Sequence, residues 1–175
     1  MTMFPVERLK VLLVEDNPHF RTFVRSLLEA LGVEEIEEAQ DGGEALEILK
    51  SYRADLAFLD WKMDGIDGVE CVRRIRKGDD TVNRFLPIIM LTGYTEDRLV
   101  DEARQAGVSG FLGKPISAKS LFSKILSLME ATQVYIETKD YFGPDRRGGT
   151  IAYKGEDRRV AQTNVLTYEP FVGRA

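Results

Sequence analysis

The feature that most constrains the fold is a fivefold alternation of short apolar runs with segments of helical periodicity. In each helical segment, apolar residues recur at intervals of three and four, as they do on one face of an α-helix. The predicted strands are Lys10–Val14, Glu34–Ala39, Leu56–Asp60, Pro87–Leu91 and Gly110–Leu112. The predicted helices begin near Pro18, Gly42, Asp67, Thr95 and Ser117. This alternation predicts an α/β protein in which helices cover both faces of a parallel sheet.

The composition of the predicted strands indicates their order in the sheet. The first, third and fourth strands are nearly unbroken apolar runs, which is typical of central strands buried on both faces. The second strand is rich in glutamate, as edge strands often are, because charge there blocks unwanted pairing. With right-handed crossovers, these properties predict the strand order 2-1-3-4-5 of a flavodoxin-like doubly wound fold with five helices.

The first helical segment has the clearest periodicity. Asn17 and Pro18 form a start signal, and Gly32 forms a stop signal. Between them, one apolar stripe is predicted from Phe20, Phe23, Val24, Leu27, Leu28 and Leu31. Asp41 and Asp67 are interpreted as turn or N-cap residues before the second and third helices.

Polar residues stand at the carboxyl ends of the predicted strands, where ligands bind in open α/β sheets. Glu15 and Asp16 follow the first strand, Asp60 ends the third, Thr92 follows the fourth, and Lys114 follows the fifth. Two carboxylates ~4 Å apart repel by about 4 kcal/mol at an effective dielectric of ~20, so a bound cation is expected. Oxygen ligands without His or Cys favour Mg²⁺. Lys114 and Thr92 would bind phosphoryl oxygens, and Asp60 would be the nucleophile that forms an acyl phosphate.

In combination, these motifs resemble the response-regulator receiver (CheY-like) family of two-component signalling. The resemblance spans about residues 8–130 and is carried by Val11–Asn17, Asp55–Met63, Asp67-Gly68, Leu91–Gly93 and Gly110–Pro115. It implies that Asp60 is phosphorylated by a histidine kinase or a histidine phosphotransfer protein, so that the protein is a signalling switch and not an enzyme. It also implies that Mg²⁺ is held by Glu15, Asp16, Asp60 and the backbone carbonyl of Lys62.

The resemblance also assigns residues to the response to phosphorylation. Thr92 and Phe111 would be the switch pair, because Thr92 vacates space for the Phe111 ring when it moves toward a phosphoryl oxygen. Lys62 and Tyr94 would tune the lifetime of the phosphoryl group. The surface of the fourth helix, fifth strand and fifth helix would then change shape and control binding to an unknown downstream protein. A phosphorylation-dependent dimer could form through the same surface.

Composition narrows the expected cellular setting and the partners. The single cysteine excludes an internal disulfide framework, and the single histidine excludes a multi-histidine metal centre. Because no long apolar stretch and no secretory signal are apparent, a cytoplasmic protein without a membrane segment is expected. The net charge of −5 disfavours general binding to nucleic acid.

The charge balance changes near residue 132. Residues 1–132 contain 17 basic and 23 acidic residues, whereas residues 133–175 contain 7 and 6. We therefore predict a receiver domain over residues 1–132 and a mostly irregular tail over residues 133–175, where Gly-Pro and Gly-Gly pairs disfavour regular structure. The tail repeats the motif Tyr-x-Gly-x-Asp-Arg-Arg, so that Tyr141, Asp145, Arg146 and Arg147 recur as Tyr153, Asp157, Arg158 and Arg159.

Alternatives remain open for the tail and for the function. The tail is either a solvated, disordered segment or a paired motif whose arginines bind carboxylates, a phosphate or the acidic receiver of the same chain. One alternative function is a nucleic-acid-binding regulator that uses the Arg-rich tail, although these arginines lie beside acids. Another is an aspartyl-phosphate hydrolase. Such hydrolases usually carry a second acid two residues after the nucleophile, where this chain has Lys62.

Overall fold

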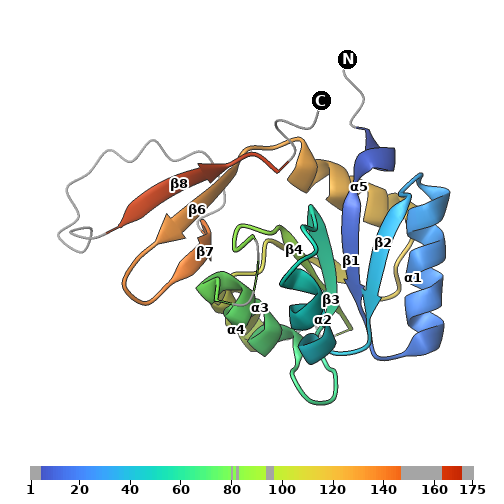
Figure 1. Ribbon diagram of the computed structural model, residues 1–175, viewed down its shortest axis with the longest axis horizontal. Coiled ribbons are helices and arrows are strands. Elements are labelled where there is room, and N and C mark those ends of the chain that lie inside the picture. The colour runs from blue at the N-terminus through green and yellow to red at the C-terminus, as the bar shows by residue number, and fades with distance from the viewer. Residues whose placement is uncertain (1–4, 80, 82, 94–96, 147–162, 171–175) are drawn as a thin grey trace.

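A five-stranded parallel sheet forms the centre of the protein in a computed structural model (Figure 1). The structure describes residues 5–79, 81, 83–93, 97–146 and 163–170. The strands of this sheet are β1 (Lys10–Val14), β2 (Glu35–Ala39), β3 (Leu56–Asp60), β4 (Ile88–Thr92) and β5 (Gly110–Gly113). Their order is β2-β1-β3-β4-β5, and each pairing is parallel. The predicted doubly wound α/β fold and its strand order are therefore confirmed.

Burial of the strands follows their positions in the sheet. Every residue of β3 and of β4 is buried, and in β1 only Lys10 is partly exposed. The edge strand β2 instead alternates exposed and half-buried residues until it reaches the buried Ala39. Its glutamates face solvent or basic partners, as in the ion pair between Lys10 Nζ and Glu35 Oε1 at 2.8 Å. The charge of β2 thus suits its edge position.

Several helices begin at side-chain caps that are visible in the sequence. The helices are α1 (Pro18–Ala30), α2 (Gly42–Leu49), α3 (Gly68–Lys77), α4 (Asp97–Ala106) and α5 (Ala118–Met129), and a short 3₁₀ helix, η1 (Val6–Arg8), precedes β1. Asn17, Asp41, Asp67 and Ser117 each accept hydrogen bonds from backbone N–H groups in the first turn of the helix that follows. No helix in the described part of the chain has the length and apolar character needed to cross a bilayer.

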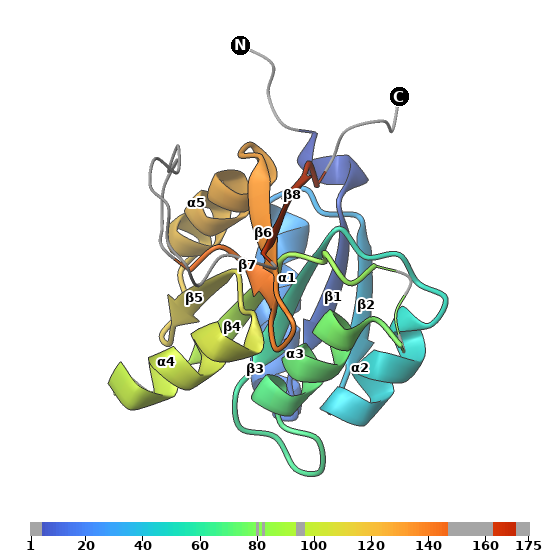
Figure 2. The ribbon, with the colours of Figure 1, turned by 90° about the vertical axis from the view of Figure 1, so that its left-hand side faces the viewer.

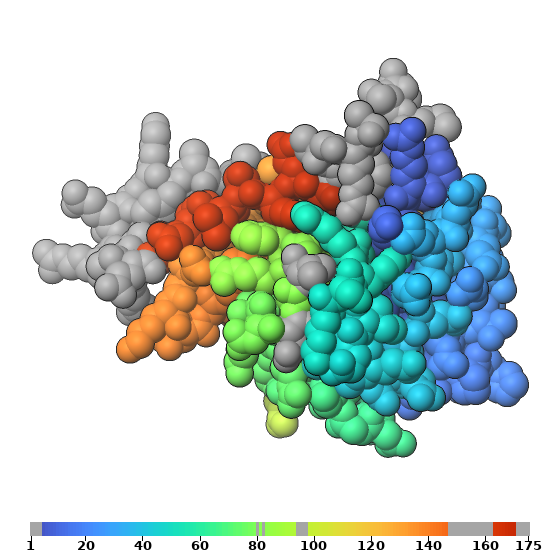
Figure 3. Space-filling model, in the orientation of Figure 1, coloured from blue at the N-terminus to red at the C-terminus, as the bar shows by residue number. Residues whose placement is uncertain are grey.

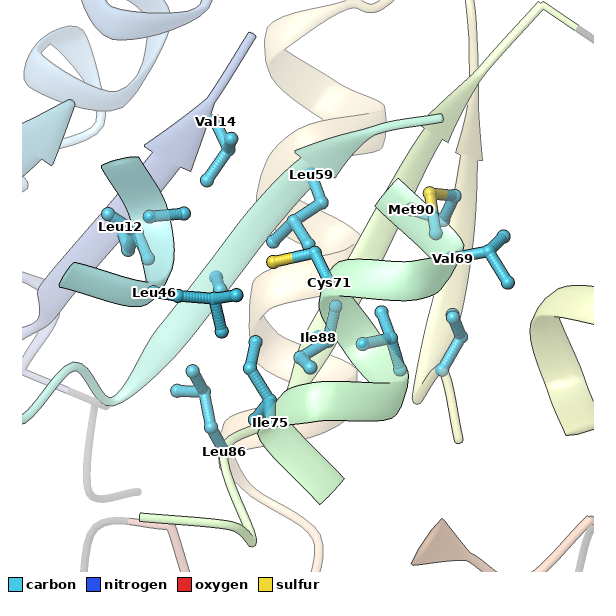
Figure 4. Close-up of a cluster of buried hydrophobic side chains, with 14 of the residues drawn as sticks. Leu12, Val14, Leu46, Leu59, Val69, Cys71, Ile75, Leu86, Ile88 and Met90 are labelled. Atoms are coloured by element: carbon cyan, nitrogen blue, oxygen red, sulfur yellow. The ribbon is translucent and has the colours of Figure 1, made fainter. Parts of the chain in front are cut away.

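The helices cover the two faces of the central sheet and bury a separate apolar cluster on each face (Figures 1 and 2). On one face, α2, α3 and α4 pack against side chains such as Leu12, Leu59 and Ile88. Figure 4 shows Cys71 and Ile75 of α3 within this cluster. On the other face, α1 and α5 pack against the alternate residues of the same strands. Burial on both faces explains why β1, β3 and β4 are almost wholly apolar.

The apolar stripe predicted for the first helix is only partly buried. Val24 and Leu28 are fully buried against the sheet, whereas Phe23 is 45% exposed. The Phe23 ring lies beside that of Phe20, with a centroid distance of 5.9 Å. The stripe is therefore wider than the area of α1 that the sheet covers.

The C-terminal residues form a second sheet, where the sequence predicted a mostly irregular tail. The strands β6 (Gln133–Glu137), β7 (Phe142–Pro144) and β8 (Asn164–Tyr168) pair antiparallel in the order β7-β6-β8. We call these strands the C-terminal sheet. The prediction was wrong for these residues, because burial against the rest of the chain decides their conformation more than local composition does. Residues 147–162, which include Arg147 and the second copy of the repeated motif (Tyr153, Asp157, Arg158 and Arg159), lie outside the described residues.

An aromatic cluster holds the C-terminal sheet against the segment that precedes β4. Each strand contributes one ring around Phe85, with centroid distances of 5.1 Å to Tyr135, 5.1 Å to Phe142 and 5.4 Å to Tyr168. Tyr135 is fully buried, and its hydroxyl donates to the carbonyl of Phe85. In Figure 3 the orange and red atoms of this sheet lie directly against the green atoms that include α3. The C-terminal sheet is therefore packed onto the central domain, although a domain boundary at residue 132 stays a prediction.

Candidate functional site

The ends of four neighbouring strands bring the predicted polar residues to one edge of the central sheet. Glu15 and Asp16 follow β1, Asp60 ends β3, Thr92 ends β4, and Lys114 follows β5. Because these strands are parallel and adjacent, their carboxyl ends meet at the same edge. The backbone N–H of Lys114 also donates to the Thr92 carbonyl at 2.8 Å. The convergence predicted from the sequence is therefore present.

Three carboxylates and one ammonium group form the centre of this edge. One carboxylate oxygen from each of Glu15, Asp16 and Asp60 lies within 4.8 Å of the others. Lys114 Nζ donates to Asp60 Oδ1 at 2.9 Å and to Glu15 Oε2 at 3.2 Å. Glu15 is 1% exposed and Asp60 is 7% exposed, whereas Asp16 is exposed. This acidic cluster is therefore closed on one side and open to solvent on the side of Asp16.

Burial opposes ionisation of the two buried acids. Desolvation is the main cause of the raised pKa of Asp60, and the charge of Asp16 adds to it, while Lys114 acts in the opposite direction. Desolvation also raises the pKa of Glu15, although a hydrogen bond from the backbone N–H of Asn17 partly offsets it. Burial disfavours the charge of Lys114, but its bonds to Asp60 and Glu15 together outweigh this and raise its pKa. One ammonium group thus leaves the acidic cluster only partly neutralised.

We expect these raised pKa values to make the stability of the folded chain depend on pH. Because the pKa of Asp60 and that of Glu15 are raised on folding, the folded state binds more protons, and the free energy of unfolding falls as the pH rises through the folded-state values. This destabilisation vanishes when the pH is below the pKa values that these carboxyl groups have in the unfolded chain, which are about 4.

The substitution Asp60→Asn removes one of these titrations. The stability of the variant relative to the wild type should therefore increase between about pH 4 and pH 7 in metal-free buffer. Urea unfolding of both proteins at several pH values measures this difference. A difference that stays constant with pH would contradict the expectation.

The turn after β3 requires a glycine. The N–H of Gly68 donates to the carbonyl of Trp61 at 2.9 Å, which folds the chain back toward Asp60. A Cβ atom on Gly68 would lie 2.3 Å from the Asp60 carbonyl oxygen, so a larger residue would displace the backbone that carries Asp60. The Asp67-Gly68 pair therefore has a double role, as the N-cap of α3 and as the closing contact of this turn.

The predicted switch residues lie on neighbouring strands. The register of β4 and β5 places Phe111 opposite Met90 and Gly113 opposite Thr92. Phe111 and Thr92 are therefore diagonal neighbours on the same face of the sheet. Thr92 is buried, whereas Phe111 is half-buried and packs against the cluster beneath α4.

Other predicted residues are placed only in part. The side chain of Lys62 is exposed, and a metal contact through its backbone carbonyl stays a prediction. Tyr94 lies outside the described residues. In the tail motif, Tyr141, Asp145 and Arg146 are described and lie just before and just after β7.

Two residues of α1 support the acidic cluster and were not predicted from the sequence. Lys114 Nζ lies 4.3 Å from the centroid of the Phe20 ring, which is a cation–π contact. Arg21 Nη1 donates to the backbone carbonyl of Glu15 at 2.6 Å and so fixes the chain at the acidic pair. In the sequence, Phe20 belongs to an apolar stripe and Arg21 resembles an ordinary surface cation. Only their position one turn after the acidic pair could have indicated these roles.

A doubly wound sheet with an acidic cluster and a lysine at its carboxyl edge defines a class of signal receiver domains. The sequence pattern described as response regulator receiver domain matches residues 11–126. The chain therefore belongs to the response regulator receiver family. The match ends before the C-terminal sheet begins at Gln133.

Chemotaxis proteins are similar to this chain over the same region. CheY-3 of Vibrio cholerae is 35% identical over 124 residues, which cover 71% of this chain and 94% of that protein. CheY of Pseudomonas aeruginosa is 36% identical over 122 residues, which cover 70% of this chain and 97% of that protein.

Solved structures agree with this assignment. The chemotaxis protein CheY4 of Vibrio cholerae superposes with a TM-score of 0.63 at 33% identity, covering 68% of this chain and 97% of that one. The receiver domain of a sensor histidine kinase from Pseudomonas aeruginosa gives a TM-score of 0.64 at 28% identity, covering 70% of this chain and 98% of that one. The latter was solved with a magnesium ion coordinated in its active-site cleft.

Proposed function

We propose that this protein is a phosphoacceptor switch in which Asp60 receives a phosphoryl group from a histidine kinase or a histidine phosphotransfer protein. The observation that carries the proposal is the acidic cluster, in which oxygens of Glu15, Asp16 and Asp60 lie within 4.8 Å of one another beside the Lys114 ammonium. Asp60 is the central member, since it ends the buried strand β3, bonds Lys114 and experiences the charge of Asp16.

The transfer is a displacement at phosphorus. A carboxylate oxygen of Asp60 forms a bond to phosphorus while the bond from phosphorus to the donor imidazole nitrogen breaks, and the electron pair of that bond leaves with the imidazole. Lys114, which bonds Asp60 directly, would bond one phosphoryl oxygen of the product, and the hydroxyl of Thr92 would bond another. Positioning and neutralisation of charge are most of what such a transfer requires.

The residues at this edge fit a bound Mg²⁺. The donor set consists of carboxylate oxygens, which Mg²⁺ prefers, and the open side at Asp16 leaves room for the waters that this ion retains. Glu15, Asp16 and Asp60, together with the carbonyl of Lys62, would hold the ion. When bound, it supplies positive charge that offsets repulsion among the acids and the charge of the phosphoryl group.

Phosphorylation would be read at the surface formed by α4, β5 and α5. The phosphoryl group adds a charge of about −1.5 to −2 beside Thr92 and Lys114. Because Phe111 is a diagonal neighbour of Thr92, a shift of Thr92 changes the space available to the Phe111 ring. Phe111 has no hydroxyl, so its positions differ in packing alone. A downstream protein, or a second copy of the chain, would recognise the altered surface.

The direct test is phosphorylation by the small donor acetyl phosphate. With Mg²⁺ present, we expect each chain to gain one phosphoryl group. Chelation of the metal should lower the initial rate at least about tenfold, which corresponds to about 1.4 kcal/mol of transition-state stabilisation. Intact-protein mass spectrometry follows the reaction, and a sodium salt at equal ionic strength is the control. Equal labelling with and without Mg²⁺ would contradict the proposed role of the acidic cluster.

A further inference from the structure

The C-terminal sheet contacts the central domain where β4 and β5 begin, at the end of the strands opposite to the acidic cluster (Figure 1). Phe85 precedes β4 and Gly107 precedes β5, and both belong to this contact. The C-terminal sheet therefore lies at the connection between α4 and β5, two of the three elements of the proposed output surface.

At this connection, two glycines allow the backbones to meet without side chains between them. A Cβ atom on Gly143 of β7 would lie 2.9 Å from Gly107 Cα and 2.5 Å from the Tyr141 hydroxyl. Gly107 has a φ of 107°, which favours glycine. The Tyr141 hydroxyl donates to the Pro144 carbonyl at 2.8 Å, and the Arg146 guanidinium lies 4.2 Å from the centre of the Tyr141 ring. Residues 141–146 of the first motif copy, which include β7, thus pack against the end of α4.

A buried arginine joins this contact to the start of β4. Arg76 Nε donates to the carbonyl of Gly107 at 2.9 Å, and its Nη1 donates to the carbonyls of Arg84 and Leu86 at 2.7 and 2.8 Å. The guanidinium lies 5.5 Å from the centre of the Tyr135 ring. An ion pair between Arg84 and Glu137 adds a second polar contact to β6. The end of α4, the start of β4 and the C-terminal sheet are therefore held together.

The strand β5 connects this contact to the acidic cluster. It has only four residues, Gly110–Gly113, and Lys114 follows it directly. Phe111 also lines a recess of about 410 Å³ whose other side is formed by Pro144, Asp145 and Arg146. A movement of Phe111 would therefore change the recess that the C-terminal residues help to form. The short strand β5 thus begins beside the docked sheet and is followed by Lys114 of the acidic cluster.

We infer that the C-terminal sheet docks at the connection between α4 and β5, beside the proposed output surface, and that its docking opposes phosphorylation of Asp60. The inference rests on the proposed function. The sheet is docked in an arrangement in which Lys114 bonds Asp60 directly, whereas phosphorylation requires Lys114 to bond the phosphoryl group instead. If docking favours the direct bond, linkage requires phosphorylation to weaken docking by the same factor. The C-terminal sheet lies beyond residue 126, where the family match ends.

The test compares the affinity of the wild type and of Gly143→Val for beryllofluoride with Mg²⁺, a stable mimic of the acyl phosphate. Valine at position 143 should weaken docking, because its Cβ would approach Gly107 too closely. We expect beryllofluoride to bind Gly143→Val at least about fivefold more tightly, the lower end of typical allosteric couplings. Trp61 is the single tryptophan, follows Asp60 and is 8% exposed, so its fluorescence reports binding.

Two further variants keep the comparison decisive. Glu137→Gln removes the ion pair with Arg84 without steric strain, and it should shift the affinity in the same direction by a smaller factor. Val165→Ala changes a residue of β8 that is 63% exposed, and it should bind beryllofluoride within about twofold of the wild type. Amide NMR spectra of the wild type with beryllofluoride should also show shifts in β6 and β7.

The possible outcomes separate this inference from the proposed function. The inference alone would be overturned by two observations together. Beryllofluoride would bind at Asp60 with equal affinity in the wild type, Gly143→Val and Glu137→Gln, and the β6 and β7 amide signals would not change. Weaker binding by Gly143→Val would show that docking assists phosphorylation, which also overturns it. If neither the Trp61 fluorescence nor the β3 amide signals of the wild type change when beryllofluoride and Mg²⁺ are added, the proposed function is overturned, and the inference with it.

Discussion

Replacement of Asp60 by asparagine is expected to abolish phosphorylation by acetyl phosphate, with a rate at least about a thousandfold below that of the wild type. The carboxamide has nearly the same shape as the carboxylate, but its oxygen is a poor nucleophile at neutral pH. Lys114 keeps its bond to Glu15 in the variant, so the surroundings of the lost nucleophile stay in place. Incorporation of radiolabelled phosphoryl groups in the presence of Mg²⁺ measures the effect.

The matched control for this experiment is Asp64→Asn. Asp64 is an exposed acid in the turn that follows Asp60, so its substitution changes the net charge equally but leaves the acidic cluster intact. We expect Asp64→Asn to be labelled within about twofold of the wild type, as is usual for surface substitutions. If Asp60→Asn still accepts a phosphoryl group at a comparable rate, the nucleophile is another residue and the proposed reaction is wrong.

The central sheet could be predicted because the local composition of each strand indicates how deeply that strand is buried. β3 is an unbroken apolar run up to Asp60, and only a strand that is buried on both faces has that composition. The caps Asn17 and Asp67 were equally visible, since they act on N–H groups within the next few residues. These signals are local in sequence, so a single sequence contains them.

The acidic cluster could be predicted because parallel strands place their carboxyl ends side by side. Once strands β1, β3 and β5 were assigned, the meeting of Glu15, Asp60 and Lys114 followed from topology alone. The contact of Phe20 with Lys114 did not follow, because it depends on the rotation of α1 against the sheet. A periodic pattern identifies an apolar face but does not show which of its residues lies at the edge of that face.

The C-terminal sheet could not be predicted because its stability comes from residues that are distant in the chain. β7 has only three residues, two of which are Gly143 and Pro144, so its local composition indicates a turn. The stabilising contact is with Phe85, which the aromatic rings of β6, β7 and β8 surround. The spacing of these rings along the chain follows neither a strand nor a helix period. The aromatic residues of the tail, which include Tyr135, Phe142 and Tyr168, were the available signal of a docking site.

The largest effect on stability is expected from Arg76→Met. Arg76 is 3% exposed, and no carboxylate in the described part of the chain lies within ion-pair distance of its guanidinium. Burial lowers its pKa, and its charge is offset mainly by the carbonyls of Gly107, Arg84 and Leu86. Gly107 follows the last residue of α4, where the helix dipole is negative and favours a cation.

Methionine at position 76 would fill much of the same volume but would leave these buried carbonyls without their donor. An unsatisfied buried polar group costs about 1–3 kcal/mol, so we expect the free energy of unfolding to fall by about 3–5 kcal/mol. Arg74→Met, two residues earlier on α3, is the matched control, because Arg74 is exposed and, among the described residues, forms an ion pair only with Glu70 on the same helix. It should change stability by no more than about 0.5 kcal/mol.

Urea unfolding followed by Trp61 fluorescence measures both arginine variants, and Arg76→Lys extends the series. Lysine keeps the positive charge but loses the planar guanidinium that reaches three carbonyls at once. The free energy of unfolding of Arg76→Lys should therefore lie between those of the wild type and Arg76→Met. If Arg76→Met is no less stable than Arg74→Met, the carbonyls at the ends of α4 and the start of β4 do not need this donor. The contact between these elements and the C-terminal sheet would then depend on the aromatic cluster around Phe85, the ion pair between Arg84 and Glu137, and the close approach of Gly107 and Gly143.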